Sequence, residues 1–215
     1  MHVILGGTRG LGWEFAQQLR SAGHMVFVLG RSYDPALHGE GCVVDLHSES
    51  SAQDAVSKLN DIEIESFYWS TGVIYKGDFS AQKDPHQMVN VNLSNPLILV
   101  QYTWNKMLGK NAGRMVIISS TTGIKARTNE AVYALTKHAQ VGFARSLGLE
   151  AERLKSRVKV QLVIPGGMRT GFWDEYAMDP EIYSTYNEPN KVAAKILSSQ
   201  TEETFSEIVI DRGSV

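Results

Sequence analysis

The stretch VILGGTRGLGWEFAQQL, Val3–Leu19, decides the fold of this chain. It opens with an apolar run typical of a buried strand, and apolar residues recur at helical spacing from Trp13 onward. Between the two lies a Gly-x-x-x-Gly-x-Gly pattern at Gly6, Gly10 and Gly12. A strand, a glycine turn and a helix in this order let a pyrophosphate approach bare backbone while helix amides point at the anion. The stretch therefore predicts a nucleotide site, in preference to a tight loop without a ligand.

Further apolar runs alternate with segments of helical spacing along the rest of the chain. The later strands are predicted at Met25–Leu29, Cys42–Val44, Ile64–Ser70, Met115–Ile118, Val158–Ile164 and Ile208–Ile210. A long helix is predicted from Asp84 and Pro85, with an interruption at Pro96. Seven strands alternating with about six helices indicate one α/β domain over residues 1–215: a single doubly wound parallel sheet of Rossmann type, with helices on both faces.

Composition narrows the classes of function. The chain has 215 residues, 43% of them hydrophobic, and a formal net charge of −2 without a long basic run, so nucleic acid is not expected as a partner. No leader with positive charge and no apolar stretch of 18 residues is seen, so neither export nor membrane spanning is expected. The single cysteine, Cys42, is expected as a buried thiol in the cytoplasm. The histidines show no ligand spacing, and no metal is expected.

Three polar residues are placed to share one small space. Ser120 follows the predicted strand Met115–Ile118, and Tyr133 and Lys137 stand four apart on a predicted helix, hence on one face. A free tyrosine ionises near pH ~10, and a neighbouring cation favours the phenolate. A serine hydroxyl beside it can donate a hydrogen bond to a carbonyl oxygen. The alternative is that the pair is a solvated helix face.

The Tyr-x-x-x-Lys pair, the preceding serine and the glycine turn resemble the short-chain dehydrogenase/reductase family, over Val3 to Asp211. The family interval of thirteen positions selects Ser120 over Ser119. The resemblance implies a short member of the family, which moves a hydride between NADP(H) and a small-molecule carbonyl or alcohol. It implies that Tyr133 exchanges a proton with the substrate oxygen and that Ser120 orients that oxygen. It also implies that Lys137 lowers the free-energy cost of ionising Tyr133 and holds the cofactor ribose.

Three further segments resemble family motifs. Asn92 stands 28 residues before Ser120 and resembles a family asparagine whose helix opens locally to hold a water on the proton route; a satisfied core amide is equally expected. The segment Ser70–Gly72 replaces the usual Asn-Ala-Gly and keeps only the glycine. The segment Pro165–Thr170 resembles the Pro-Gly-x-x-x-Thr loop at the nicotinamide end of the cofactor.

Arg31 follows the second predicted strand where an NAD-binding chain would carry a carboxylate. Together with Arg9 it offers two guanidinium groups for a 2′-phosphate, which favours NADP(H) over NAD(H), although NAD(H) stays possible. The alternative is that Arg31 is only a surface residue that follows a strand. Asp45 resembles a family aspartate that contacts adenine, or it caps the next helix. The predicted cofactor residues are Gly6, Thr8, Arg9, Gly10, Leu11, Gly12, Arg31, Asp45, Leu46, Ser70, Thr71, Gly72, Tyr133, Lys137, Pro165, Gly166, Met168 and Thr170, and the predicted catalytic residues are Asn92, Ser120, Tyr133 and Lys137.

Aromatic residues gather after the Pro165 loop, at positions 172, 173, 176, 183 and 186. They either close over a substrate or only pack together. The resemblance also implies a homodimer or homotetramer through the helices carrying Asn92 and Tyr133. A second hypothesis is a non-catalytic NADP(H)-binding regulator with the same fold, which the replaced asparagine at Ser70 supports.

Overall fold

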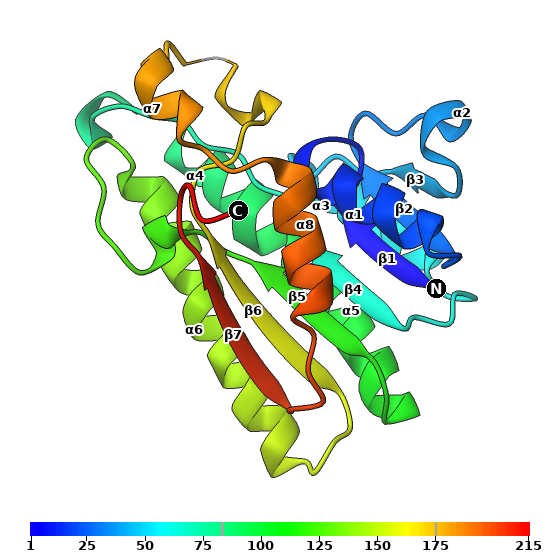
Figure 1. The fold of residues 1–215 in the computed structure, drawn as a ribbon. Coiled ribbons are helices and arrows are strands. Elements are labelled where there is room, and N and C mark those ends of the chain that lie inside the picture. Colours follow the sequence, from blue (N-terminus) through cyan, green and yellow to red (C-terminus); the bar gives the residue numbers. More distant parts are fainter. Residues whose placement is uncertain (83, 175) are drawn as a thin grey trace.

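The computed structural model describes residues 1–82, 84–174 and 176–215. Its core is a seven-stranded sheet in the order β3-β2-β1-β4-β5-β6-β7, with every pair parallel (Figure 1). The strands are β1 His2–Leu5, β2 Val26–Gly30, β3 Gly41–Val43, β4 Ser66–Trp69, β5 Arg114–Ile118, β6 Lys159–Pro165 and β7 Phe205–Ile210. The chain builds outward from β1 to β3 and then restarts at β4 on the other side, which confirms the predicted doubly wound sheet. Ligands bind such sheets at this switch point, beyond the carboxyl ends of the strands.

Helices cover both faces of the sheet (Figure 1). The helices are α1 Gly10–Ser21, α2 Pro35–His38, α3 Glu49–Lys58, α4 Pro85–Val89, α5 Asn95–Lys110, α6 Ala131–Arg153, α7 Pro180–Ser184 and α8 Pro189–Ser198. One core joins the strands to α1 and α8, where Phe15 and Ile196 are fully buried; the other joins them to α3, α5 and α6. Within the described ranges no helix combines the length and apolar character needed to cross a bilayer.

The glycine turn between β1 and α1 depends on residues without a side chain. Gly6 has φ of +90°, a region that side chains disfavour, and Gly10 has φ of +55°. A Cβ on Gly12 would lie 2.2 Å from the backbone oxygen of Gly6. Helix α1 can therefore start against the turn only because Gly12 is glycine.

The long predicted helix from Pro85 is divided one turn earlier than expected. It consists of α4, a π-helical turn at Asn90–Ser94 and α5, so the opening centres on Asn92 while Pro96 lies in the first turn of α5. Proline has no N–H and cannot donate to the carbonyl four residues back, which here belongs to Asn92. The prediction of an interruption is thus confirmed, and Pro96 cannot restore the α-helical hydrogen bond to the Asn92 oxygen.

Strand β3 is less buried than its apolar sequence suggests. Cys42 is half-buried and Val43 is 58% exposed, because β3 lies at the edge of the sheet and pairs only with β2. The expected fully buried thiol was therefore wrong, although burial still raises the pKa of Cys42. Capping of α3 by Asp45 was also wrong, since the Ser48 side chain accepts from the backbone N–H of Ser51.

Candidate active site

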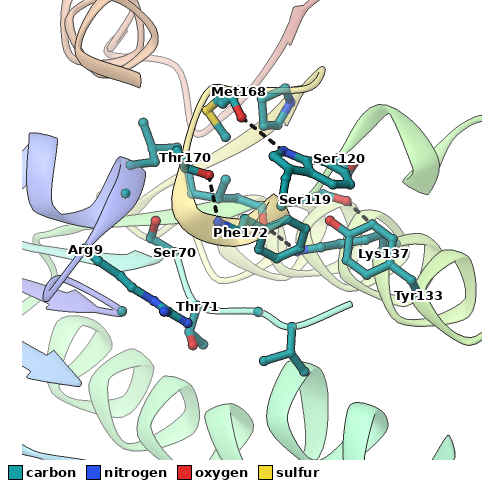
Figure 2. A pocket seen from close by; sticks show the side chains of 18 of the residues that line it. Arg9, Ser70, Thr71, Ser119, Ser120, Tyr133, Lys137, Met168, Thr170 and Phe172 are labelled. Atoms are coloured by element: carbon teal, nitrogen blue, oxygen red, sulfur yellow. Dashed lines mark hydrogen bonds between the residues drawn. The ribbon is translucent and has the colours of Figure 1, made fainter. Parts of the chain in front are cut away.

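A cavity of about 520 Å³ opens at the carboxyl ends of the central strands (Figure 2). It is lined by all of the predicted catalytic and cofactor residues except Gly12 and Asn92. Gly12 packs against the back of the glycine turn, and the Asn92 side chain is fully buried behind Gly72. Segments far apart in the sequence therefore meet at one site.

Ser120, Tyr133 and Lys137 lie together in this cavity, on the same side of it (Figure 2). Ser120 follows β5, and its Oγ accepts from the backbone N–H of Thr122 at 3.1 Å. Tyr133 lies in the first turn of α6, with the Lys137 Nζ 5.6 Å from the centre of its ring. A side-chain hydrogen bond joins Ser120 to Tyr133. The solvated helix face is excluded, since Tyr133 and Lys137 are both buried.

Burial sets the proton affinities of this pair. Burial raises the pKa of the Tyr133 phenol, the hydrogen bond with Ser120 opposes this, and the negative charge of Glu130 adds to the increase. Burial also lowers the pKa of Lys137 to about 7. The lysine Nζ donates to the backbone oxygen of Ile118 at 3.1 Å and to Gln140 Oε1 at 2.9 Å. In this structure Tyr133 therefore keeps its proton at neutral pH, as a proton donor requires.

Asn92 is the satisfied core amide of one expectation, and its helix is opened locally as the other implied, while the water on the proton route stays a prediction. Its helix is opened into a π turn, yet its side-chain amide is satisfied within the core. Oδ1 accepts from the N–H of Val73 at 2.7 Å, while Nδ2 donates to the Val73 oxygen at 2.9 Å and to Thr136 Oγ1 at 3.1 Å. Asn92 thereby holds the segment that follows β4, next to Ser70–Gly72.

The glycine turn and the Pro165 loop meet at the cavity wall. A Cβ on Gly10 would lie 3.6 Å from the Thr170 side chain. Thr170 Oγ1 accepts from the N–H of Phe172 at 3.4 Å, and Trp173 Nε1 donates to the Met168 oxygen at 3.0 Å (Figure 2). These bonds hold the Pro165 loop in a fixed shape at the cavity wall.

The other end of the cavity is lined by Arg9, Arg31 and Asp45. Arg9 extends from the glycine turn into this space (Figure 2). Hydrogen bonds from the side chain and backbone of His47 hold the pKa of Asp45 below its ordinary value. Ser70 Oγ is buried and has no hydrogen-bond partner among the described residues, so it leaves a polar atom at the wall.

The aromatic residues after the Pro165 loop fall into two groups, one that lines the cavity and one that packs. Phe172, Trp173 and Tyr186 line the cavity, whereas Tyr176 donates its hydroxyl to the Ile74 oxygen at 2.7 Å and so pins the loop. Tyr183 packs on Tyr186 with ring centres 5.6 Å apart. The aromatic wall beside Tyr133 is therefore built partly from residues that line the cavity and partly from residues that pack against them.

Sequence reasoning missed several residues of this site. Glu130, Lys125, Arg127 and Arg212 line the cavity, and Gln140 hydrogen-bonds to Lys137 behind it. Gln140 had a signal in the sequence, because a polar residue three positions after the lysine falls on the same, otherwise apolar helix face. Lys125, Arg127 and Arg212 had no such signal in the sequence, because the loops that carry them meet only in the folded chain.

The fold also gathers His2, His24 and Glu65, whose ligand-type atoms lie within 4.8 Å of one another. The sequence showed no ligand spacing because these residues come from three separate segments. The N-terminal ammonium already pairs with Glu65 at 2.8 Å. The group lies where β1 begins, away from the cavity.

Fold and cavity together define a Rossmann-type α/β protein with its site at the carboxyl ends of a parallel sheet. A sequence model described as short chain dehydrogenase matches residues 1–181. The chain belongs to this family of oxidoreductases, as its motifs indicated.

Named relatives agree with this assignment. The 3-oxoacyl-[acyl-carrier-protein] reductase FabG of Aquifex aeolicus is 28% identical over 203 residues, covering 86% of this chain and 80% of that protein. Carbonyl reductase family member 4 of Danio rerio is 28% identical over 213 residues, covering 91% and 88%. The solved structure titled "ElxO with NADP Bound" superposes with a TM-score of 0.82 at 20% identity, covering 99% of this chain and 98% of that chain.

Proposed function

We propose that residues 1–215 form one dinucleotide-binding domain that transfers a hydride between NADP(H) and a carbonyl or alcohol substrate. The observation that carries the proposal is the convergence of Ser120, Tyr133 and Lys137 on a cavity that the glycine turn also lines. The relatives are named as reductases of 3-oxoacyl and carbonyl compounds, and a structural neighbour holds NADP. These names support a carbonyl substrate and the phosphorylated cofactor.

The residues present fit such a cofactor. The glycine turn leaves backbone open where side chains would intrude, and the buried Ser70 Oγ lacks a partner that a polar ligand would supply. Arg9 and Arg31 would hold a 2′-phosphate, and Met168 and Thr170 would hold the nicotinamide end. When bound, the dinucleotide supplies or accepts the hydride.

The protein's own part in the reaction is the handling of a proton. Tyr133 is buried and protonated at neutral pH, so it gives its hydroxyl proton to the carbonyl oxygen as the carbon is reduced. Ser120, bonded to Tyr133, orients that oxygen by a hydrogen bond. In its charged form, Lys137 stabilises the phenolate that remains.

The test is the loss of NADPH absorbance with a panel of carbonyls that includes a 3-oxoacyl thioester, a diketone and simple aldehydes. We expect turnover of at least one class, and a decrease of about 10²- to 10⁴-fold in kcat for Tyr133→Phe, the range of general acid catalysis. NADPH should still bind to this variant, as followed by fluorescence. Equal turnover by Tyr133→Phe would contradict the proposal.

The same assay separates the second hypothesis, a non-catalytic NADP(H)-binding regulator. That protein would bind NADPH and reduce none of the carbonyls. The Ser70 side chain, at the position of the replaced asparagine, makes no hydrogen bond among the described residues. Turnover of any carbonyl by the wild type would exclude this hypothesis.

We also propose self-association through α5 and α6. Leu135 and Leu149 on α6 are 57% and 67% exposed, and Leu97 on α5 is 37% exposed. Burial of such apolar surface between two copies would remove it from water. Light scattering should give a multiple of the chain mass, decreased by Leu149→Glu; a monomeric wild type would contradict this.

A further inference from the structure

We propose that Gln140 is a positioning residue of this site, which links the opened helix at Asn92 to the Lys137 amine. Its Oε1 accepts from Lys137 Nζ at 2.9 Å, and its Nε2 donates to the backbone oxygen of Asn92 at 3.2 Å. All three residues are buried, and Gln140 and Asn92 are 0% exposed. The carboxamide therefore bridges two elements of the site without water access.

Pro96 cannot give the Asn92 oxygen its usual α-helical donor. In a regular α-helix the N–H of residue 96 would donate to the oxygen of residue 92, and proline has no N–H to give. A buried carbonyl without a donor is costly. Gln140 supplies a donor from α6, across the interface with the π turn.

This bond decides which end of the amide faces the lysine. A carbonyl oxygen can only accept, so Asn92 takes the NH₂ group and leaves Oε1 directed at Lys137. An ammonium can only donate, so Oε1 and the Ile118 oxygen together fix the direction of Nζ. The opening of the helix thus acts on the lysine through Gln140.

Among the described residues, few charged groups lie near enough to Lys137 to affect its pKa. Tyr133 on α6 is a titratable neighbour of Lys137, and the charge of Glu130 acts on that tyrosine. From β5, the loop after β4 and the π turn, the groups near it are neutral: the Ile118 oxygen, Gly72 and Asn92. A change at Gln140 should therefore appear directly in the titration of Lys137.

The experiment measures that titration in the cofactor-free protein. Lysine labelled with ¹³C at Cε is followed by NMR across pH, with Lys137→Met assigning the signal. For Gln140→Met, of similar size without an amide, we expect the midpoint to fall by about half a unit or more, because the ammonium loses an acceptor. For Gln140→Glu, the new carboxylate should raise the midpoint by about one to three units.

The kinetic arm rests on the proposed function. Gln140→Met should lower kcat about tenfold while KM for the carbonyl stays within about twofold, because the displaced amine acts on Tyr133 and not on the carbonyl substrate. Gln140→Glu, which restores an acceptor, should recover part of the loss. The matched control is Gln161→Met on β6, a glutamine 1% exposed that bonds to Ser199 at 3.0 Å outside the cavity. It should leave kcat and the Lys137 midpoint unchanged.

Two results would overturn the assignment. One is a Gln140→Met protein in which the Lys137 titration midpoint and kcat equal those of the wild type. The other is a Gln140→Glu protein in which the Lys137 midpoint does not rise, and this result decides the question if Gln140→Met does not fold. If the wild type reduces no carbonyl, the proposed function fails, while the NMR titration still tests the role of Gln140.

Discussion

Replacement of Lys137 by methionine should change how the stability of the protein depends on pH. Burial lowers the pKa of Lys137 from its ordinary 10.5 to about 7 in the folded chain. Between pH 10.5 and about 7, Lys137 is protonated in the unfolded chain but not in the folded chain. Burial of Lys137 therefore costs no stability above pH 10.5, and the free energy of unfolding decreases as the pH falls from 10.5 to 7. The full difference between the two pKa values corresponds to a loss of at most roughly 5 kcal/mol in the free energy of unfolding.

The pH slope is a sharper observable than the stability at a single pH. Methionine removes the cost of protonation but leaves the Ile118 oxygen and Gln140 Oε1 without their donor, at about 1–3 kcal/mol each, so at pH 7 the two effects partly cancel. From pH 7 to 9.5, the free energy of unfolding of the wild type should rise relative to Lys137→Met by about 3 kcal/mol.

Urea unfolding at closely spaced pH values, read by tryptophan fluorescence, measures this difference. Lys191→Met, at the exposed start of α8, is the control for the loss of one positive charge. Parallel curves for the wild type and Lys137→Met over this pH range would refute the reasoning, because they would mean that the lysine carries its proton equally in both states.

Three further outcomes follow from the site. Gly12→Ala would place a Cβ 2.2 Å from the Gly6 oxygen, so urea unfolding should show a loss of about 3 kcal/mol or more; wild-type stability would contradict this packing. Arg31→Gln should weaken NADPH binding about tenfold and leave NADH binding unchanged in a fluorescence titration, through the loss of a charge-assisted bond; an equal loss for both cofactors would place Arg31 elsewhere. Ser120→Ala should lower kcat about 10²-fold in steady-state kinetics with NADPH affinity retained, and an unchanged kcat would exclude its orienting role.

Local patterns in the sequence determined most of the architecture. A glycine turn after the first strand, apolar runs alternating with helical spacing, and a tyrosine and lysine four apart each report geometry that the backbone imposes over a few residues. Because the carboxyl ends of parallel strands share one edge, residues after separate strands were expected together, and Ser120 and Thr170 indeed line one cavity.

Only the tertiary structure decided the proton affinities of these residues and the contacts that orient them. The raised pKa of Tyr133, the lowered pKa of Lys137 and the link from Asn92 through Gln140 depend on burial and on contacts between separate elements. The exposure of Val43 likewise follows from the place of β3 at the sheet edge, which its apolar sequence does not encode. Desolvation and long-range hydrogen bonds are properties of what surrounds a group, and these surroundings exist only once distant segments have packed together.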